Sequence, residues 1–307
     1  DGSAWVGGVA PTAADDAVLQ ATTTSMTIGA GSVCRSLTTT LFTGTLTHTA
    51  GVTLTIGDGT AGAGNVALAF GTFTYTLGNA STSAISFVST SATVQTINFN
   101  GKTTGNVTFN ATSNGSWQLT GGWSALSGTI DLTKGTLDTN GQTCNWGFFD
   151  SGGSSARTLT LGASQISVNF SSNNCWNTNN SGLTLNAGTS TITLNGSSET
   201  FRTSSYTFYS IVIAGSGSHY FNNSASAFTC TNFTITGTAN KTDNFQLGSN
   251  ITVTGALTIN GNSSINRELV SSNTVGTART FTTTGATVTC TNTDFQDITL
   301  SVAKDFS

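Results

Sequence analysis

The acidic residues are the first candidates for catalysis, because enzymes that cleave glycans use two carboxyl groups at a set separation, one of them as general acid. The 307-residue chain holds eleven Asp and only two Glu. The candidate pairs are Asp131 with Asp138 and Asp294 with Asp297. Both pairs lie in regular, strand-like sequence, where an outward Asp that caps a turn is the ordinary explanation. The acids therefore favour turn chemistry over catalysis.

Histidines and glycine-rich segments give no stronger signal. His48 alternates with threonines on an expected strand, and His219 lies beside a Gly-Ser turn. The glycine-rich segment that follows Ile56 lacks the lysine of a phosphate-binding loop and precedes no helix, so we interpret it as a loop between strands. Asp58 within it is isolated from other acids, and calcium-binding repeats are absent from the sequence. We expect no metal ion and no cofactor.

Aromatic side chains are the remaining candidates, because sugar rings stack on exposed indole and phenol faces. Trp146 and Trp176 lie in turn-like sequence, and Tyr206 and Tyr209 follow a pair of serines. We name these four as candidate residues for contact with a glycan or with a second subunit. Packing between coils or subunits is the favoured role for the two tryptophans.

Five cysteines, Cys34, Cys144, Cys175, Cys230 and Cys290, are spread widely through the chain. No CxxC spacing occurs, so a zinc site is not expected. An odd number with wide gaps favours buried free thiols that act as small apolar side chains. Free thiols in turn favour assembly in a reducing cytoplasm.

Composition excludes several functional classes. Charged residues make up 7 % of the chain, the formal net charge is −4, and the nine Lys and Arg are scattered singly. Without a basic patch to neutralise phosphates, nucleic-acid binding is disfavoured. No apolar run approaches the length that spans a bilayer, so we expect no membrane insertion.

Alternation of apolar and polar residues, typical of strands with one buried face, runs through nearly the whole chain. Gly, Asn and Ser follow each alternating segment and supply backbone conformations that β-branched residues resist. No segment shows the apolar spacing of a helix. The sequence therefore predicts an all-β protein. The clearest expected strand regions are 46–57, 70–78, 96–101, 105–113, 127–141, 157–170, 209–215, 231–237, 250–261 and 286–295.

Repetition distinguishes among all-β architectures. The segment 181–201, SGLTLNAGTSTITLNGSSETF, repeats one pattern within a dozen residues, and related patterns continue to residue 300. Such repetition favours a β-solenoid over a sandwich or barrel. We expect a solenoid domain over 26–307, preceded by an attachment or capping segment over 1–25. Leu183, Leu185, Ile192 and Leu194 should point inwards, so that Leu185→Asp would cost several kcal/mol.

Several segments resemble bacteriophage virion proteins of the tail-fibre and spike kind. LTKGTLDTNGQTCNWGFFDSGGSSARTLTLGAS from Leu132 and the segment 181–201 are similar to their β-helices. TCTNTDFQDITL from Thr289 resembles a coil of right-handed, pectin-lyase-like β-helices, and WVGGVAPTAADDAVL from Trp5 is similar to the segment that often opens such proteins. The resemblance implies a right-handed parallel β-helix with a structural or host-binding role, and it supplies no catalytic residues.

Three functions follow as hypotheses. The first is a non-enzymatic virion protein, a fibre, spike or capsid-surface component that assembles in the host cytoplasm and binds host-surface glycans. The second is the passenger of a bacterial surface adhesin, located at the cell surface or outside the cell. The third is a glycan depolymerase on the same fold. For the first we expect contacts with other virion proteins and a homo-oligomer, a trimer by resemblance to phage fibres, because open coil ends need a partner.

Overall fold

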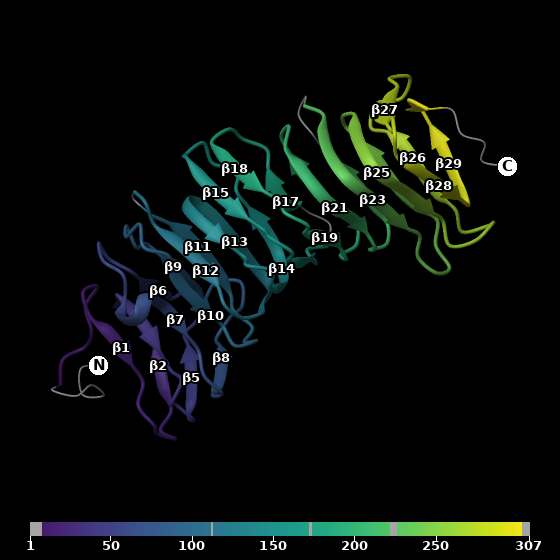
Figure 1. Cartoon of the computed structure of the whole chain (residues 1–307). Coiled ribbons are helices and arrows are strands. Elements are labelled where there is room, and N and C mark those ends of the chain that lie inside the picture. The colour runs from purple at the N-terminus through teal and green to yellow at the C-terminus, as the bar shows by residue number, and fades with distance from the viewer. Residues whose placement is uncertain (1–7, 112, 172–173, 222–225, 303–307) are drawn as a thin grey trace.

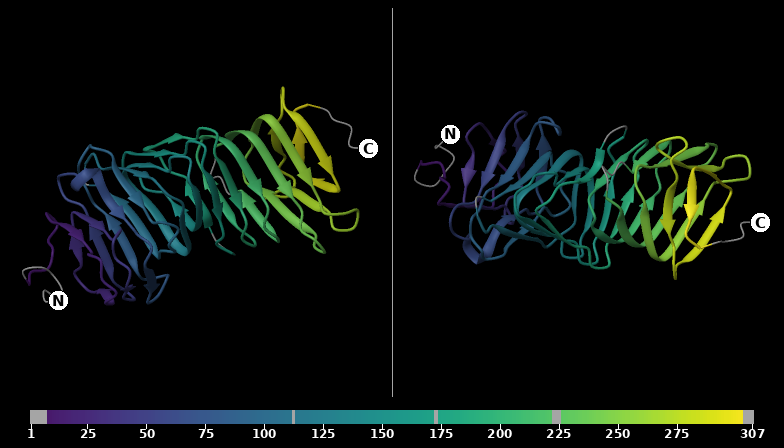
Figure 2. Two further views of the ribbon diagram at one scale, coloured as in Figure 1. Left: turned by 60° about the horizontal axis from the view of Figure 1, so that its bottom comes forward. Right: turned by 90° about the horizontal axis from the view of Figure 1, so that it is seen from above.

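The computed structural model describes residues 8–111, 113–171, 174–221 and 226–302. These residues form thirty strands and one short 3-10 turn, η2 (Ala63–Asn65), stacked side by side into an elongated body with the two chain ends far apart (Figure 1). Views from other sides show the same elongated body (Figure 2). The expectation of an all-β chain is confirmed.

The strands of the first half are β1 (Asp16–Val18), β2 (Met26–Ile28), β3 (Val33–Cys34), β4 (Ser36–Thr38), β5 (Thr45–His48), β6 (Thr53–Ile56), β7 (Val66–Ala69), β8 (Thr74–Leu77), β9 (Ala84–Phe87), β10 (Gln95–Asn98), β11 (Asn106–Asn110), β12 (Ser116–Leu119), β13 (Trp123–Asp138), β14 (Thr143–Asp150) and β15 (Arg157–Thr160).

The strands of the second half are β16 (Gln165–Val168), β17 (Asn174–Thr178), β18 (Leu183–Asn186), β19 (Thr191–Leu194), β20 (Thr200–Thr203), β21 (Thr207–Ile213), β22 (Ser218–Phe221), β23 (Phe228–Thr236), β24 (Asp243–Leu247), β25 (Ile251–Asn260), β26 (Glu268–Ser272), β27 (Arg279–Thr282), β28 (Thr287–Thr291), β29 (Thr293–Gln296) and β30 (Ile298–Leu300).

Parallel pairing between successive coils builds the body. Ile192 on β19 lies in register with Ile166 on β16 and with Ile211 on β21, and the other pairings of β1 to β30 are also parallel. The sequence separation of stacked residues varies, from 19 between Asp131 and Asp150 to 31 between Asn260 and Thr291. Coils of unequal length therefore stack into one parallel β-solenoid, which confirms the architecture expected from the repetition.

The ladder begins before residue 26. Strand β1 lies within the segment 1–25, which was expected to be an attachment or capping segment, and its Ala17 pairs in register with Leu37 on β4. Trp5, at the start of the segment that carries the resemblance, lies outside the described residues. The described part of the N-terminal segment thus contributes a strand to the first coil.

The interior is one continuous apolar core because each strand turns alternate residues inwards. Phe87, Phe109, Ile130 and Phe149, on four stacked strands, are all fully buried. Glycine is required where coils approach most closely. A Cβ on Gly128 would collide with the carbonyl oxygen of Gly105, so these corners accept no larger residue without a shift of the backbone.

The four residues predicted to point inwards are not equally buried. Ile192 and Leu194 are fully buried, Leu183 is nearly so, and Leu185 is half-buried at the edge of the core. Leu185→Asp should therefore cost less than an unpaired buried charge would, because its carboxylate can reach water.

We expect Leu185→Ala to lower the free energy of unfolding by about 1 kcal/mol and Ile192→Ala by about 2–4 kcal/mol, because only Ile192 would leave an enclosed cavity. Chemical denaturation of the two variants measures the difference. Equal losses would contradict the assignment of Leu185 to the rim of the core.

Candidate functional site

Trp146 and Trp176 do not lie at the surface. Both indoles are fully buried, Trp146 on β14 and Trp176 on β17. Their ring centroids lie 5.5 Å and 4.4 Å from that of Phe149, which sits between them. Contact of these two tryptophans with a glycan is therefore ruled out, whereas packing between coils, the role that the sequence favoured, is confirmed. Their sequence resembles a turn, but each loop is followed directly by a strand, and the tryptophan lies on the inward face of that strand.

The two candidate tyrosines lie closer to solvent. Tyr206 and Tyr209 are half-buried, and the Tyr206 hydroxyl donates a hydrogen bond to the carbonyl oxygen of Asn180, 2.9 Å away. Tyr220 on β22, which the sequence analysis did not single out, is more exposed, at 37 %. The structure leaves Tyr206 and Tyr209 as candidates for surface contact.

Asp131 and Asp138 do not form a pair. Both lie on β13, but Asp131 is in register with Asp150 on β14, whereas Asp138 pairs along a different ladder with Thr160 on β15. The Asp138 carboxylate accepts hydrogen bonds from the Gln118 side chain and from the backbone N–H of Asn140, at 2.9 and 2.7 Å. Its role is to hold the turn after β13, as the ordinary explanation of such an Asp predicts.

The second candidate pair is also used structurally. Asp294 accepts two hydrogen bonds from Nε of Arg267, at 3.0 and 2.9 Å, and this ion pair fixes the last coil to the one before it. Asp297 accepts a 2.8 Å hydrogen bond from the backbone N–H of Gly276 and occupies the left-handed region, with φ 54°. Both carboxylates therefore hold the backbone of the C-terminal coils.

Strand register brings together a different pair of carboxylates. Asp131 and Asp150 are neighbours on adjacent parallel strands, about 4.8 Å apart along the solenoid. Burial and the nearby charge of Asp150 raise the pKa of Asp131, against a hydrogen bond from Thr133 that lowers it. Asp150 accepts hydrogen bonds from the Asn177 side chain and the Gly152 N–H, both at 2.9 Å. Nineteen positions separate the two residues in sequence. Their pairing depends on the length of the coil between them, so the sequence analysis did not predict it.

The two histidines are buried and have structural partners. Nδ1 of His48 lies 2.8 Å from the Tyr75 hydroxyl, and its Nε2 lies 3.0 Å from the carbonyl oxygen of Val52. Nε2 of His219 lies 3.0 Å from the carbonyl oxygen of Gly215. Burial lowers the pKa of both imidazoles. Each neutral ring thus serves as a buried partner for the backbone.

Both glutamates of the chain are buried, which the sequence did not reveal. Glu199 is fully buried, and its Oε2 accepts a 2.9 Å hydrogen bond from the N–H of Gly196, while Oε1 has no partner. Burial raises its pKa to about 8. Glu268 lies in register with Asp243, and burial together with the Asp243 charge raises its pKa to about 8. Each holds a proton at neutral pH.

Asp243 remains ionised beside Glu268. Its carboxylate accepts hydrogen bonds from the N–H groups of Gly217 and Thr238 and from the Thr238 hydroxyl, at 2.8, 2.7 and 2.6 Å. Burial acts to raise the pKa of Asp243, but these hydrogen bonds outweigh it and the pKa is lowered. One charged and one neutral carboxyl therefore lie side by side within the wall.

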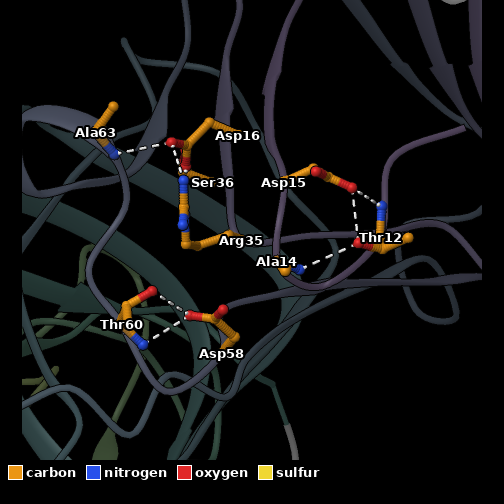
Figure 3. A network of polar contacts seen from close by, with 9 residues as sticks. All are labelled: Thr12, Ala14, Asp15, Asp16, Arg35, Ser36, Asp58, Thr60 and Ala63. Carbon is orange, nitrogen blue, oxygen red and sulfur yellow. Dashed lines mark hydrogen bonds and ion pairs between the residues drawn. The ribbon is translucent and has the colours of Figure 1, made fainter.

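A polar network holds the first coil together (Figure 3). Asp16 accepts hydrogen bonds from Nε and Nη2 of Arg35, at 2.9 and 2.5 Å, and from the hydroxyl of Ser36 at 2.6 Å. The Arg35 bonds lower the pKa of Asp16. The N–H of Ala63 adds a fourth bond at 3.2 Å and so ties the loop after β6 to β1. Sequence spacing alone does not predict this link.

The glycine-rich loop after Ile56 is confirmed as a connection between strands. Oδ1 of Asp58 accepts hydrogen bonds from the N–H and hydroxyl of Thr60, at 2.7 and 3.0 Å, which closes a local turn (Figure 3). The Asp58 carboxylate thus bonds to residues of its own loop. Among the residues that the structure describes, no group of three acids, histidines or cysteines is placed to hold a metal ion.

The core opens at the N-terminal end of the solenoid. A cavity of about 710 Å³ lies there, with Pro11, Met26, Ile28, Val33 and Leu46 in its lining. Most of the lining residues are apolar. We refer to this opening as the N-terminal mouth. Its chemistry suits an apolar occupant rather than a charged substrate.

All five cysteines are free, as predicted. Cys34, Cys144, Cys175 and Cys230 are buried, whereas Cys290 on β28 is half-buried. Burial raises the pKa of Cys34 and of Cys144 to about 12, and that of Cys290 to about 11.

Thiol titration should therefore find five free thiols in denaturant without reductant, and in the native chain Cys290 should react first. A Cys290→Ser variant should lose the early phase alone. Fewer than five thiols in the denatured chain would contradict the free-thiol assignment.

Comparison with known proteins gives no relative: no protein-family model, no curated protein and no solved structure matches the chain. Within the described ranges, no helix is long and apolar enough to cross a membrane.

Proposed function

We propose that the chain is a structural protein of a bacteriophage particle, a fibre, spike or capsid-surface component that serves as a rigid rod. The observation that carries the proposal is the parallel stacking of the described strands β1 to β30 around one aromatic-rich core. An elongated stack of coils suits a projecting or spacing element. The resemblance of 132–164 and 181–201 to phage β-helices points to a virion as the setting.

Contacts of the rod would be made by its sides and ends. Tyr206 and Tyr209 are the candidate side residues for a host-surface glycan or a neighbouring virion protein. A matched pair of variants, Tyr206→Ala and Tyr209→Ala, should weaken adsorption to host cells if these rings bind. Unchanged adsorption of both variants would remove them from the binding surface.

Immunogold labelling of the source material tests the virion role. Antibodies raised against the purified chain should decorate intact phage particles, and the protein should co-purify with capsid proteins through a density gradient. Label confined to the bacterial cell envelope would favour the adhesin passenger instead and would sink the virion proposal.

The Asp131–Asp150 pair favours a second candidate, a glycan depolymerase. A carboxyl group with a raised pKa beside a second carboxyl group is the arrangement that acid–base hydrolysis uses. The purified chain should then release reducing sugar from host capsule, and Asp131→Asn should abolish the release while leaving the fold intact. Absence of release by the wild-type chain would leave the structural role alone.

A further inference from the structure

One wall of the solenoid carries no charged side chain. It is built from parallel strand segments that stack on successive coils: 143–146, 165–169, 191–195, 210–214, 232–236, 256–260 and 287–291. None of these segments contains Asp, Glu, Lys or Arg. By contrast, Asp131, Asp150 and Arg202 all lie at outward positions of one register column on a second wall. We refer to the first face as the uncharged wall.

The outward side chains of the uncharged wall form columns along the solenoid. The central column consists of Asn145, Ser167, Thr193, Val212, Thr234, Thr258 and Thr289. Every member is half-buried or exposed, and the residues next to them in the strands, such as Ile192 and Ile211, point into the core. Val212 is the fourth of the seven and the one aliphatic side chain among them, and Ala214 on the same coil is exposed. An apolar centre with hydroxyl and amide groups around it is the composition of an interface.

Charge determines which face a second copy of the chain can approach. Each copy carries a formal net charge of −4, so two copies repel each other wherever acidic side chains meet. Burial of an unpaired charge at a contact is strongly unfavourable as well. The uncharged wall avoids both costs, which makes it the complementary surface for the same wall of another copy.

The spacing of the uncharged wall also matches a second copy. Rows of a parallel ladder repeat every 4.8 Å or so, so the side chains of one wall can fit between the rows of an identical wall along its whole length. Six such steps and a width of five residues give a face of about 29 by about 17 Å, or roughly 500 Å² on each copy. The total of about 1,000 Å² is the least that a specific interface is expected to bury. We therefore expect a reversible pair.

We propose that two copies of the chain pack with their uncharged walls face to face, as a pair related by a two-fold axis at the row of Val212. Whether the two rods run in the same or in opposite directions, this axis brings Val212 opposite its counterpart. The contact is isologous and closes after two copies, so it builds neither a trimer nor a filament. The inference goes beyond the virion role and would fail separately from it, because association of the purified chain does not depend on the particle in which the chain resides.

A charge placed at the axis tests the pair. Val212→Lys would bring two ammonium groups together and should weaken association by roughly tenfold or more, as measured by sedimentation velocity over a concentration series. Gln246→Lys is the matched control, because Gln246 lies outwards on β24, in register between Tyr220 and Ser271 on the second wall. This control makes the same change of charge and should associate as the wild type does. Circular dichroism establishes that both variants are folded.

Cross-linking tests the position of the axis. In a Cys290→Ser background, a short bis-maleimide should join Val212→Cys chains into a covalent dimer, because sheets packed face to face lie about 10 Å apart. Gln246→Cys chains should remain largely uncoupled under the same conditions. If Val212→Lys does not fold, this pair of cysteine variants decides the matter.

Three outcomes would overturn the proposal. A wild-type chain that stays monomeric at its highest soluble concentration would leave the uncharged wall to a partner of another kind. A folded Val212→Lys chain that associates as the wild type does would place the contact elsewhere. Equal cross-linking of Val212→Cys and Gln246→Cys would show that Val212 does not lie at the axis.

Discussion

Replacing Trp176 with alanine is expected to lower the free energy of unfolding by about 3–5 kcal/mol. The indole is fully buried, and its ring centroid lies 4.4 Å from Phe149 and 5.9 Å from Phe201. Its removal would open a cavity between coils that the closed backbone ladder cannot collapse to fill. Urea denaturation followed by circular dichroism measures the loss.

Tyr220→Ala is the matched control for this truncation. Tyr220 is an aromatic residue on a neighbouring region of the same wall, but its ring is turned outwards, and we expect a change below about 1 kcal/mol. Equal effects of Trp176→Ala and Tyr220→Ala would contradict the inward placement of the tryptophan.

Alkaline pH is expected to destabilise the solenoid through its two glutamates. The pKa of Glu199 and of Glu268 is about 8 in the folded chain and near 4.5 when unfolded. The folded state therefore holds more protons between these values, so stability falls as pH rises and the loss is complete above about pH 8. A shift of this size corresponds to roughly 4–5 kcal/mol for each carboxyl.

The double variant Glu199→Gln, Glu268→Gln should flatten this dependence, because the amides stay neutral at every pH. Melting temperatures measured from about pH 7 to about pH 8, between the titration of the histidines and that of the thiols, should fall for the wild type and fall less for the variant. Asp15→Asn serves as the control. Hydrogen bonds from Thr12 lower the pKa of this exposed carboxyl, so the substitution should change stability at acidic pH and leave the alkaline dependence unaltered. A wild-type melting temperature that is constant over this pH range would contradict the buried, protonated state of both glutamates.

Local pattern predicted the architecture well, because a period of two identifies the buried face of a strand without knowledge of its neighbours. Ile192 and Leu194 were correctly assigned on this basis. The same rule cannot tell the centre of the core from its rim, because the burial of an inward residue depends on how far the next coil extends over it. Leu185 is half-buried for this reason.

The candidate sites were predicted less well, because they depend on stacking between coils. Asp131 meets Asp150 and Glu268 meets Asp243 only through the register of strands in successive coils. Since coil length varies along the chain, sequence spacing does not predict which residues become neighbours. The exposure of Trp146 and Trp176 was mispredicted for a different reason. Both residues directly follow loop-like sequence, and only their places on β14 and β17 show that their side chains point inwards.

Spin-label distances along one ladder test the solenoid most directly. Ser124, Asn145, Ser167, Thr193, Val212, Thr234, Thr258 and Thr289 lie in register on successive coils. In a Cys290→Ser background, the buried native thiols should stay unlabelled. Electron double resonance should then place labels at Ser124 and Thr289 about 34 Å apart, and labels at Thr193 and Thr289 about 19 Å apart, because each coil adds about 4.8 Å. Distances that do not increase with the number of coils between the labels would contradict the stacked solenoid.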